Sequence, residues 1–176
     1  MLSWRFLAAF AAAATVWAFA LWSGPITNLR PTTKAELAQT ITLPAPKDGR
    51  ARPLIAIVAD NAGTETTDFL VPLGILRAAG VADVVTVSTL SEPVTLMPAL
   101  TVLADMTLDD FTAAYPAGAD VVIVPALHDP NTPAIVDWLK QQHAQGATVM
   151  TICEGAWVAA AAGVLDGKRP PPIGTR

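Results

Sequence analysis

The chain is poor in cysteine, histidine and charge. It has one cysteine, Cys153, and two histidines among its 176 residues, so no internal disulfide can form. No cysteine or histidine pair has metal-ligand spacing, and no metal or cofactor is expected. Charged residues make up 15% and the net charge is −4, which excludes a basic nucleic-acid-binding protein. With 52% hydrophobic residues the chain is too apolar for disorder.

One long apolar run lies near the N-terminus. Arg5 precedes the segment Phe6–Trp22, which has no charged residue and is about 25 Å long as a helix, the lower limit for crossing a bilayer. A basic start before an apolar core is also the layout of a secretory signal. The sequence Ala18-Phe19-Ala20 offers a cleavage site, but it lies inside the run. An uncleaved anchor through residues 6–22 is therefore favoured over a cleaved signal, with the domain exported to the extracytoplasmic (periplasmic) side.

The rest of the chain divides by composition. Residues 1–22 are the signal or anchor helix, and residues 23–52 contain several prolines between polar residues, which is typical of a linker. Residues 53–169 carry the pattern of a folded domain, and residues 170–176 form a proline-rich tail. The expected organisation is one domain held near a membrane by a tether.

Short apolar runs alternate with helical periodicity from residue 54 onward. Strands are expected at 54–58, 84–88, 121–124 and 147–152, with a short hairpin strand at 100–103. Helices are expected at 69–79, 107–115, 133–145 and 156–164. This alternation predicts an α/β fold with a parallel sheet and helices on both faces. Ligands in such folds lie beyond the carboxyl ends of the strands, so the loops after Val58, Val124 and Ile152 form the candidate site.

Cys153 is the centre of the predicted chemistry. It ends one strand and begins a helix in the segment Thr151–Ala156, where a sharp turn projects the side chain from the sheet edge. The start of the helix directs backbone N–H groups toward the sulfur and favours the thiolate. Gly155 permits the tight turn. The alternative is an inert core thiol, which is common among free cysteines.

Asp68 is the second candidate site residue. It precedes an apolar helix, so the simpler interpretation is an N-cap, with Thr66 and Thr67 as rivals. It also lies at the same sheet edge as Cys153, where a carboxyl could share a proton with the thiol or orient a water. Glu65, in the same loop, is an alternative.

Three further polar residues have simpler interpretations. His128 follows the strand 121–124 and could face the site, although a loop histidine is more often solvated. His143 lies near a helix C-terminus, where a favourable contact with the helix dipole explains it. Glu154 is next to the thiol and is expected to point to solvent.

Two stretches resemble a known family. The segment Gly146–Ala156, with Asp137–Lys140 before it and Ala162–Lys168 after it, is similar to the ThiJ/PfpI family of the class I glutamine amidotransferase-like superfamily. Asp68–Pro72 resembles the acid-x-x-x-Pro helix of the branch with isonitrile hydratases and the sensory domains of AraC-type regulators. The resemblance implies a flavodoxin-like fold, often dimeric, a nucleophilic role for Cys153 and an assisting role for Asp68.

The sequence departs from this family in the site and in the tail. Family members carry Gly-Gly after the residue that matches Pro125, where this chain has Ala126-Leu127, and Glu154 replaces a small or neutral residue or a histidine. The tail reads Pro170-Pro-Pro-Ile-Gly-Thr-Arg176 where the family often has Ala-Thr-Thr-His-Trp-Tyr-Ala. Removing one base from codons for the family string spells this tail, so we expect a frameshift-truncated domain; a natural proline-rich end is the alternative.

Three functional classes remain from the sequence. The first is a cysteine-dependent hydratase or hydrolase acting on a small electrophilic carbon. The second is a non-enzymatic ligand-sensing module, and the third is an inactive truncated fragment. The expected partners are the membrane and a small-molecule ligand, with a homodimer for the full-length protein and no nucleic acid.

Overall fold

The computed structural model of the chain describes residues 42–168, which contain two sheets and four helices. The central sheet is parallel, in the order β6-β3-β1-β7-β8. Its strands are β1 (Leu54–Ala59), β3 (Asp83–Ser88), β6 (Met106–Thr107), β7 (Val121–Val124) and β8 (Thr148–Thr151). The small sheet contains β2 (Thr64–Glu65), β4 (Val94–Met97) and β5 (Leu100–Val102). The helices are α3 (Thr66–Ala79), α4 (Leu108–Ala114), α5 (Pro133–Ala144) and α6 (Gly155–Ala161).

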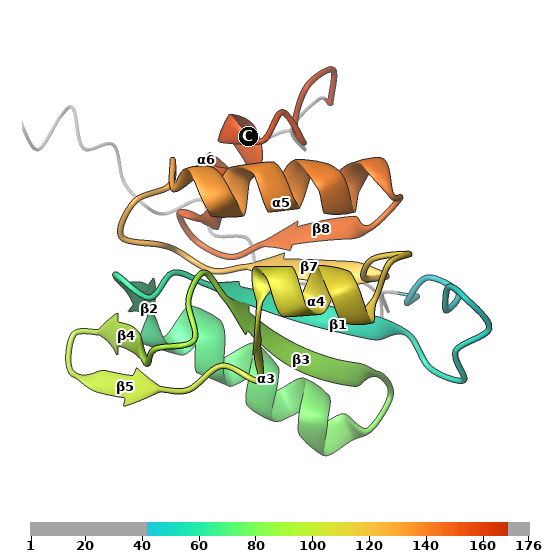
Figure 1. Cartoon of the computed structure of the whole chain (residues 1–176), viewed down its shortest axis with the longest axis horizontal. Helices are drawn as coiled ribbons and strands as arrows, with labels where there is room; N and C mark the ends of the chain where they lie inside the picture. The colour runs from blue at the N-terminus through green and yellow to red at the C-terminus, as the bar shows by residue number, and fades with distance from the viewer. Residues whose placement is uncertain (1–41, 169–176) are drawn as a thin grey trace, which may run out of the picture. The chain divides into compact units, whose positions relative to one another are not determined.

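The central strand β1 divides the core into two layers. All six of its residues are buried, and successive side chains point to opposite faces of the sheet. Leu54, Ala56 and Val58 pack with residues of α4, α5 and α6, whereas Ile55 and Ile57 pack with Phe69 of α3. Figure 1 shows the same division, with α5 and α4 on one side of the central sheet and α3 on the other. The predicted α/β fold with a parallel sheet between helices is confirmed.

The helix ends follow local sequence signals. Thr107 caps α4 in a capping box with Asp110, and Pro133 is the first residue of α5. Gly80 ends α3 in the left-handed conformation, with φ of 63°. These three predicted boundaries are confirmed. The strands β2, β4 and β6 were not predicted, because β2 and β6 have only two residues and β4, Val94-Thr-Leu-Met97, lacks the continuous apolar run that identified β1 and β7.

The parts of the chain outside residues 42–168 include several predicted features. The apolar segment 6–22, most of the linker 23–52 and the tail 170–176 lie there, so those interpretations remain predictions. Among the described helices, none is long and apolar enough to cross a bilayer.

The described end of the linker is bonded to the domain by Asp120, whose side chain is fully buried before β7. Its carboxylate accepts hydrogen bonds from Lys47 N at 3.0 Å and Leu54 N at 2.7 Å. It also pairs with the Arg50 guanidinium at 3.0 Å. One carboxylate therefore joins the entering chain to β1 at the amino edge of the sheet.

The contribution of the Asp120–Arg50 ion pair to stability can be compared with that of an exposed ion pair. Asp120→Ala removes the carboxylate that pairs with the mostly buried Arg50 guanidinium and accepts from two backbone N–H groups, so we expect a loss of about 3–5 kcal/mol in unfolding free energy. Asp83 pairs with Arg52, and both side chains are about half exposed, so Asp83→Ala is the matched control, with a loss below about 1 kcal/mol. Urea denaturation of the three proteins measures both values. Equal losses would contradict the anchoring role of Asp120.

A second carboxylate joins α3 to β3. Oδ2 of Asp105 accepts hydrogen bonds from Thr86 N at 2.7 Å, Thr86 Oγ1 at 2.8 Å and Arg77 Nη2 at 2.6 Å. Burial alone raises the pKa of Asp105, but the Thr86 hydrogen bonds and the Arg77 charge outweigh burial and hold the pKa below its usual value. The ionised form is therefore the one that stabilises the fold.

This depressed pKa predicts a pH-dependent contribution to stability. A carboxyl with a lowered folded-state pKa stabilises the protein above its unfolded-state pKa, about 3.9 for aspartate, and loses that contribution as the pH falls through the folded-state value. Asp105→Asn should therefore be less stable than the parent at pH 7 and pH 5, with a difference that shrinks below about pH 4. Urea midpoints at pH 7, 5 and 3 measure it. A difference that stays constant to pH 3 would contradict the argument.

Candidate functional site

The turn between β8 and α6 places Cys153 at the carboxyl edge of the central sheet. Cys153 has φ of 53°, one of two non-glycine residues with positive φ in the described range, and it is exposed. A left-handed cysteine costs roughly 1 kcal/mol or more, so the surrounding packing must hold it. The turn is closed by a hydrogen bond from Gly155 N to Ile152 O at 2.9 Å. The predicted sharp turn is present, and its cysteine is not a core thiol.

Gly155 brings this turn against the end of β7. A Cβ atom on Gly155 would lie 2.1 Å from the Val124 carbonyl oxygen and 2.8 Å from that of Pro125. Both distances are shorter than any real carbon contact, and the obstacle is backbone. Ile152 N also donates to Val124 O at 2.9 Å. The absence of a side chain at position 155 is thus what lets the cysteine turn pack on the exit of β7.

Asp68, in the first turn of α3, also contacts the segment that follows β7. Its Oδ2 accepts a hydrogen bond from Ala126 N at 3.2 Å. The prediction that Asp68 or a neighbouring threonine caps α3 is wrong, since the cap is Glu65. The Glu65 side chain accepts from Asp68 N at 2.6 Å and from Thr67 Oγ1 at 2.8 Å.

The capping role determines the state of Glu65. Hydrogen bonds from the Asp68 amide and the Thr67 hydroxyl lower the pKa of Glu65 below its usual value. This carboxylate therefore stays ionised at neutral pH, and it accepts hydrogen bonds from the first turn of α3. Of Glu65 and Asp68, only Asp68 binds through its carboxylate to a segment outside α3, at the Ala126 amide.

Cys153 and Asp68 are thereby brought to one segment, residues 124–126, although they are 85 positions apart in the sequence. The turn of Cys153 packs on Val124 and Pro125 through Gly155, and Asp68 binds the amide of Ala126. The backbone N–H and C=O of Ala126 are both hydrogen-bonded, because the carbonyl oxygen accepts from Glu65 N at 2.8 Å. The Ala126 amide is consequently not available as a donor to a ligand while Asp68 holds it.

The other predicted polar residues take separate positions. His128 is exposed and lies over Gly63, where an added Cβ would be 2.9 Å from the histidine Cβ. His143 is in the last turn of α5, as expected. Glu154 is exposed and makes no side-chain cap bond to α6, in agreement with the predicted solvent orientation. None of the three is hydrogen-bonded or ion-paired to Cys153 or Asp68 in the described part of the chain.

Asp60 also lies at the carboxyl edge of the central sheet, and it was not predicted as a site residue. It follows β1 directly and is 5% exposed. Its carboxylate accepts from Ala62 N at 3.0 Å and from Thr132 Oγ1 at 2.6 Å, which joins the loop after β1 to the start of α5. Its position immediately after a wholly apolar strand is the feature of the sequence that could have identified it. Within residues 42–168, no cluster of three or more acidic, histidine or cysteine side chains is arranged to hold a metal ion.

Solved structures with the same fold are numerous. The chain is 27% identical to a two-domain protein from Anabaena variabilis with DJ-1/ThiJ/PfpI-like and ferritin-like domains, with a TM-score of 0.57 over 67% of this chain and 34% of that one. It is also 27% identical to a cysteine-to-alanine mutant of a DJ-1 superfamily protein from Salmonella typhimurium, with a TM-score of 0.57 over 65% of this chain and 63% of that one.

A third structure, oxidised DJ-1 from Toxoplasma gondii, is 24% identical, with a TM-score of 0.56 over 65% of this chain and 64% of that one. The chain spans less than two thirds of the length of each of these three proteins. No curated protein matches the chain significantly. The profile of the DJ-1/PfpI family matches residues 54–170, which include both Asp68 and Cys153. The chain therefore belongs to the DJ-1/PfpI family.

Proposed function

We propose that Cys153 is a nucleophile and that the domain is a small-molecule hydratase or hydrolase. The observation that carries the proposal is the exposed cysteine in a left-handed turn, packed by Gly155 on the end of β7. A strained conformation that the packing maintains at a sheet edge is typical of a functional position. An exposed thiol is also accessible to a substrate, which a core thiol is not.

Asp68 is the proposed acid–base partner. Its carboxylate lies at residue 126, next to the residues on which the cysteine turn packs, and Glu65 is already occupied as a cap. A positioned carboxyl at this place can take the thiol proton and return it in a later step. The proposal needs no metal or cofactor.

The substrate class we propose is a compound with a small electrophilic carbon, such as an isonitrile, as in the hydratase branch that the sequence resembles. The thiol adds across the terminal carbon: a C–S bond forms, the proton ends on that carbon, and a thioimidate results. Water then adds to the same carbon. The C–S bond breaks, the thiol is restored and an N-substituted formamide leaves.

A ligand-sensing module is the second candidate, and one contact favours it. The Ala126 amide, which follows the end of β7, is held by Asp68, so this donor is not free to stabilise an oxyanion. A domain that binds a small electrophile or oxidant at Cys153 without turnover needs no such donor. The two candidates use the same residues and differ in whether product forms.

Reactivity and turnover at Cys153 distinguish these functions. Iodoacetamide should add one group to the native protein and none to Cys153→Ser, because Cys153 is the only cysteine. An enzyme should convert an alkyl isonitrile to its formamide, with turnover abolished in Cys153→Ser and reduced roughly 10²- to 10⁴-fold in Asp68→Asn. Alkylation without turnover would support the sensor, and failure of the folded native protein to be alkylated would contradict both candidates.

The glycine contact provides a matched pair of variants for the same assay. Gly155→Ala forces the cysteine turn away from the Val124 carbonyl, so the rate of Cys153 alkylation and the turnover rate should both change. Gly74→Ala adds the same methyl group in open space on α3 and should change neither. Equal behaviour of the two variants would show that the turn geometry does not matter.

We also propose that residues 6–22 anchor the chain, with the domain on the extracytoplasmic side. The support is the length and continuity of this apolar run after Arg5. The protein should therefore stay in the membrane pellet after extraction with alkaline carbonate. Recovery of soluble chain at full mass would contradict an anchor, and soluble chain shorter by about 20 residues would indicate a cleaved signal instead.

A further inference from the structure

Helix α3 is apolar on both its inner and its outer face. On the inner face Phe69 is buried, and Leu73 and Leu76 pack in the same core. The outer face has exposed apolar residues at helical spacing, here called the α3 stripe: Val71, Gly74, Ile75 and Ala78. Residues three or four positions apart lie on one side of a helix, so the stripe is continuous. Its two large side chains, at positions 71 and 75, are 53% and 63% exposed.

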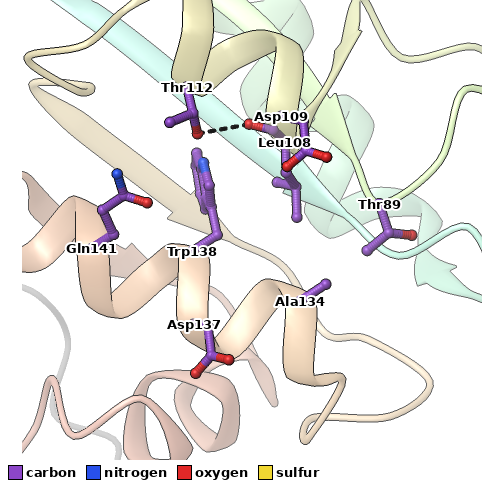
Figure 2. Close-up of a pocket in the computed structure, with 8 residues that line it drawn as sticks. All are labelled: Thr89, Leu108, Asp109, Thr112, Ala134, Asp137, Trp138 and Gln141. Atoms are coloured by element: carbon purple, nitrogen blue, oxygen red, sulfur yellow. Dashed lines mark hydrogen bonds between the residues drawn. The ribbon is translucent and has the colours of Figure 1, made fainter.

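An apolar outer face is unusual for a helix at the surface of a domain, where polar side chains are expected. Helix α5 has the usual arrangement, since Trp138 is buried whereas Asp137 and Lys140 are exposed. Figure 2 shows this arrangement, with Trp138 pointing between α4 and α5 and Asp137 pointing away from α4. The α3 stripe has no polar side chain, so contact with another apolar surface would remove it from water and stabilise the contact.

Gly74 lies in the middle of the α3 stripe, and nothing within residues 42–168 requires a glycine there. Glycine destabilises a helix interior relative to alanine. A Cβ atom at position 74 would have no atom within 4 Å, and the φ angle of Gly74 is not in the left-handed region. An exposed glycine does permit the close approach of a second helix, because the distance between two helix axes depends on the side chains at their contact.

The order of residues in the α3 stripe fits a second copy of the same helix. Two copies can pack antiparallel about a two-fold axis that passes between positions 74 and 75. Ile75 of each copy then faces Gly74 of the other, and Val71 of each copy faces Ala78 of the other. Every bulky side chain meets a small residue, as in the packing of ridges into grooves. A lipid surface or an unrelated protein would not need this match.

The charges at the two ends of α3 favour the antiparallel orientation. The Glu65 carboxylate caps the start of the helix, and Arg77 is in its last turn. The Arg77 side chain is 48% exposed although it pairs with Asp105. In an antiparallel pair the basic end of each helix lies toward the acidic end of the other, and the helix dipoles are opposed. In a parallel pair, ends of like charge would lie together.

We propose that two copies of this chain associate through the α3 stripe, with the two α3 helices antiparallel about a two-fold axis between Gly74 and Ile75. The family resemblance gave only the expectation of a homodimer, without a contact surface. The stripe includes neither Asp68 nor Cys153, so the association does not depend on the reaction proposed there.

The test is sedimentation equilibrium of the full chain over a concentration series, in a nonionic detergent matched in density by the buffer. We expect a reversible equilibrium between the 18.3 kDa monomer and a dimer. Ile75→Asp places a carboxylate without a partner in the interface and should raise the dissociation constant about tenfold or more. Leu103→Asp, at a side chain that is 71% exposed outside the stripe, is the matched control and should leave it unchanged.

A second pair of variants tests the match of bulky with small residues. Gly74→Leu places a leucine opposite Ile75 of the second copy and should weaken association by about tenfold or more. Adding Ile75→Ala places an alanine opposite that leucine and should strengthen association again by about tenfold. Equal urea midpoints show that the variants remain folded. All of them keep residues 6–22, so any association through that segment is common to them.

Three results would overturn the proposal. The first is a parent chain that remains a monomer throughout the concentration series, which would leave the α3 stripe to a different partner. The second is an equal effect of Ile75→Asp and Leu103→Asp on the dissociation constant. The third is a further loss of association when Ile75→Ala is added to Gly74→Leu, because the antiparallel pairing predicts a recovery.

Discussion

The burial of β1 along its whole length is the constraint on which the rest of the domain depends. A strand with six buried residues must be covered on both faces and paired on both edges. Its neighbours β3 and β7 run parallel to it, so each connection has to cross over a face of the sheet. The loops that begin these crossovers all start at the carboxyl edge. That requirement brings the exits of β1, β7 and β8, and with them Asp68, Ala126 and Cys153, to the same end of the domain.

Coverage of the sheet is unequal at β8. On the side of α4, α5 and α6, the core is closed by residues such as Trp138, Leu139 and Val158. On the other side, Met150 of β8 is 45% exposed, and β8 is an edge strand within the described range. The outward residues Val71 and Ile75 of α3 are also more than half exposed. Apolar side chains therefore remain exposed around α3 and β8, and on the opposite face Trp157 of α6 is 65% exposed.

Carboxylates have distinct roles that depend on their surroundings. Asp120, buried at the amino edge, joins the entering chain to β1, and Asp105 joins α3 to β3 with Arg77. Glu65 stabilises the start of α3, and Asp60 holds the loop after β1. Asp68 alone among the acids near the cysteine turn points from its helix toward the exit of β7. Of these acids, only Asp68 places its carboxylate at the segment on which the cysteine turn packs.

The sequence by itself determined the fold class, the main strands and helices and the turn at Cys153. These depend on local patterns: continuous apolar runs for buried parallel strands, capping residues such as Thr107, and a cysteine followed two residues later by glycine. The family resemblance already paired Asp68 with Cys153, but local capping rules favoured Asp68 as a cap. Only the tertiary structure decided that Glu65 caps α3, that Asp68 holds the Ala126 amide and that the Trp138 N–H is enclosed without an acceptor in the described part of the chain. Each of these depends on side-chain contacts between segments distant in sequence, which no local period or propensity encodes.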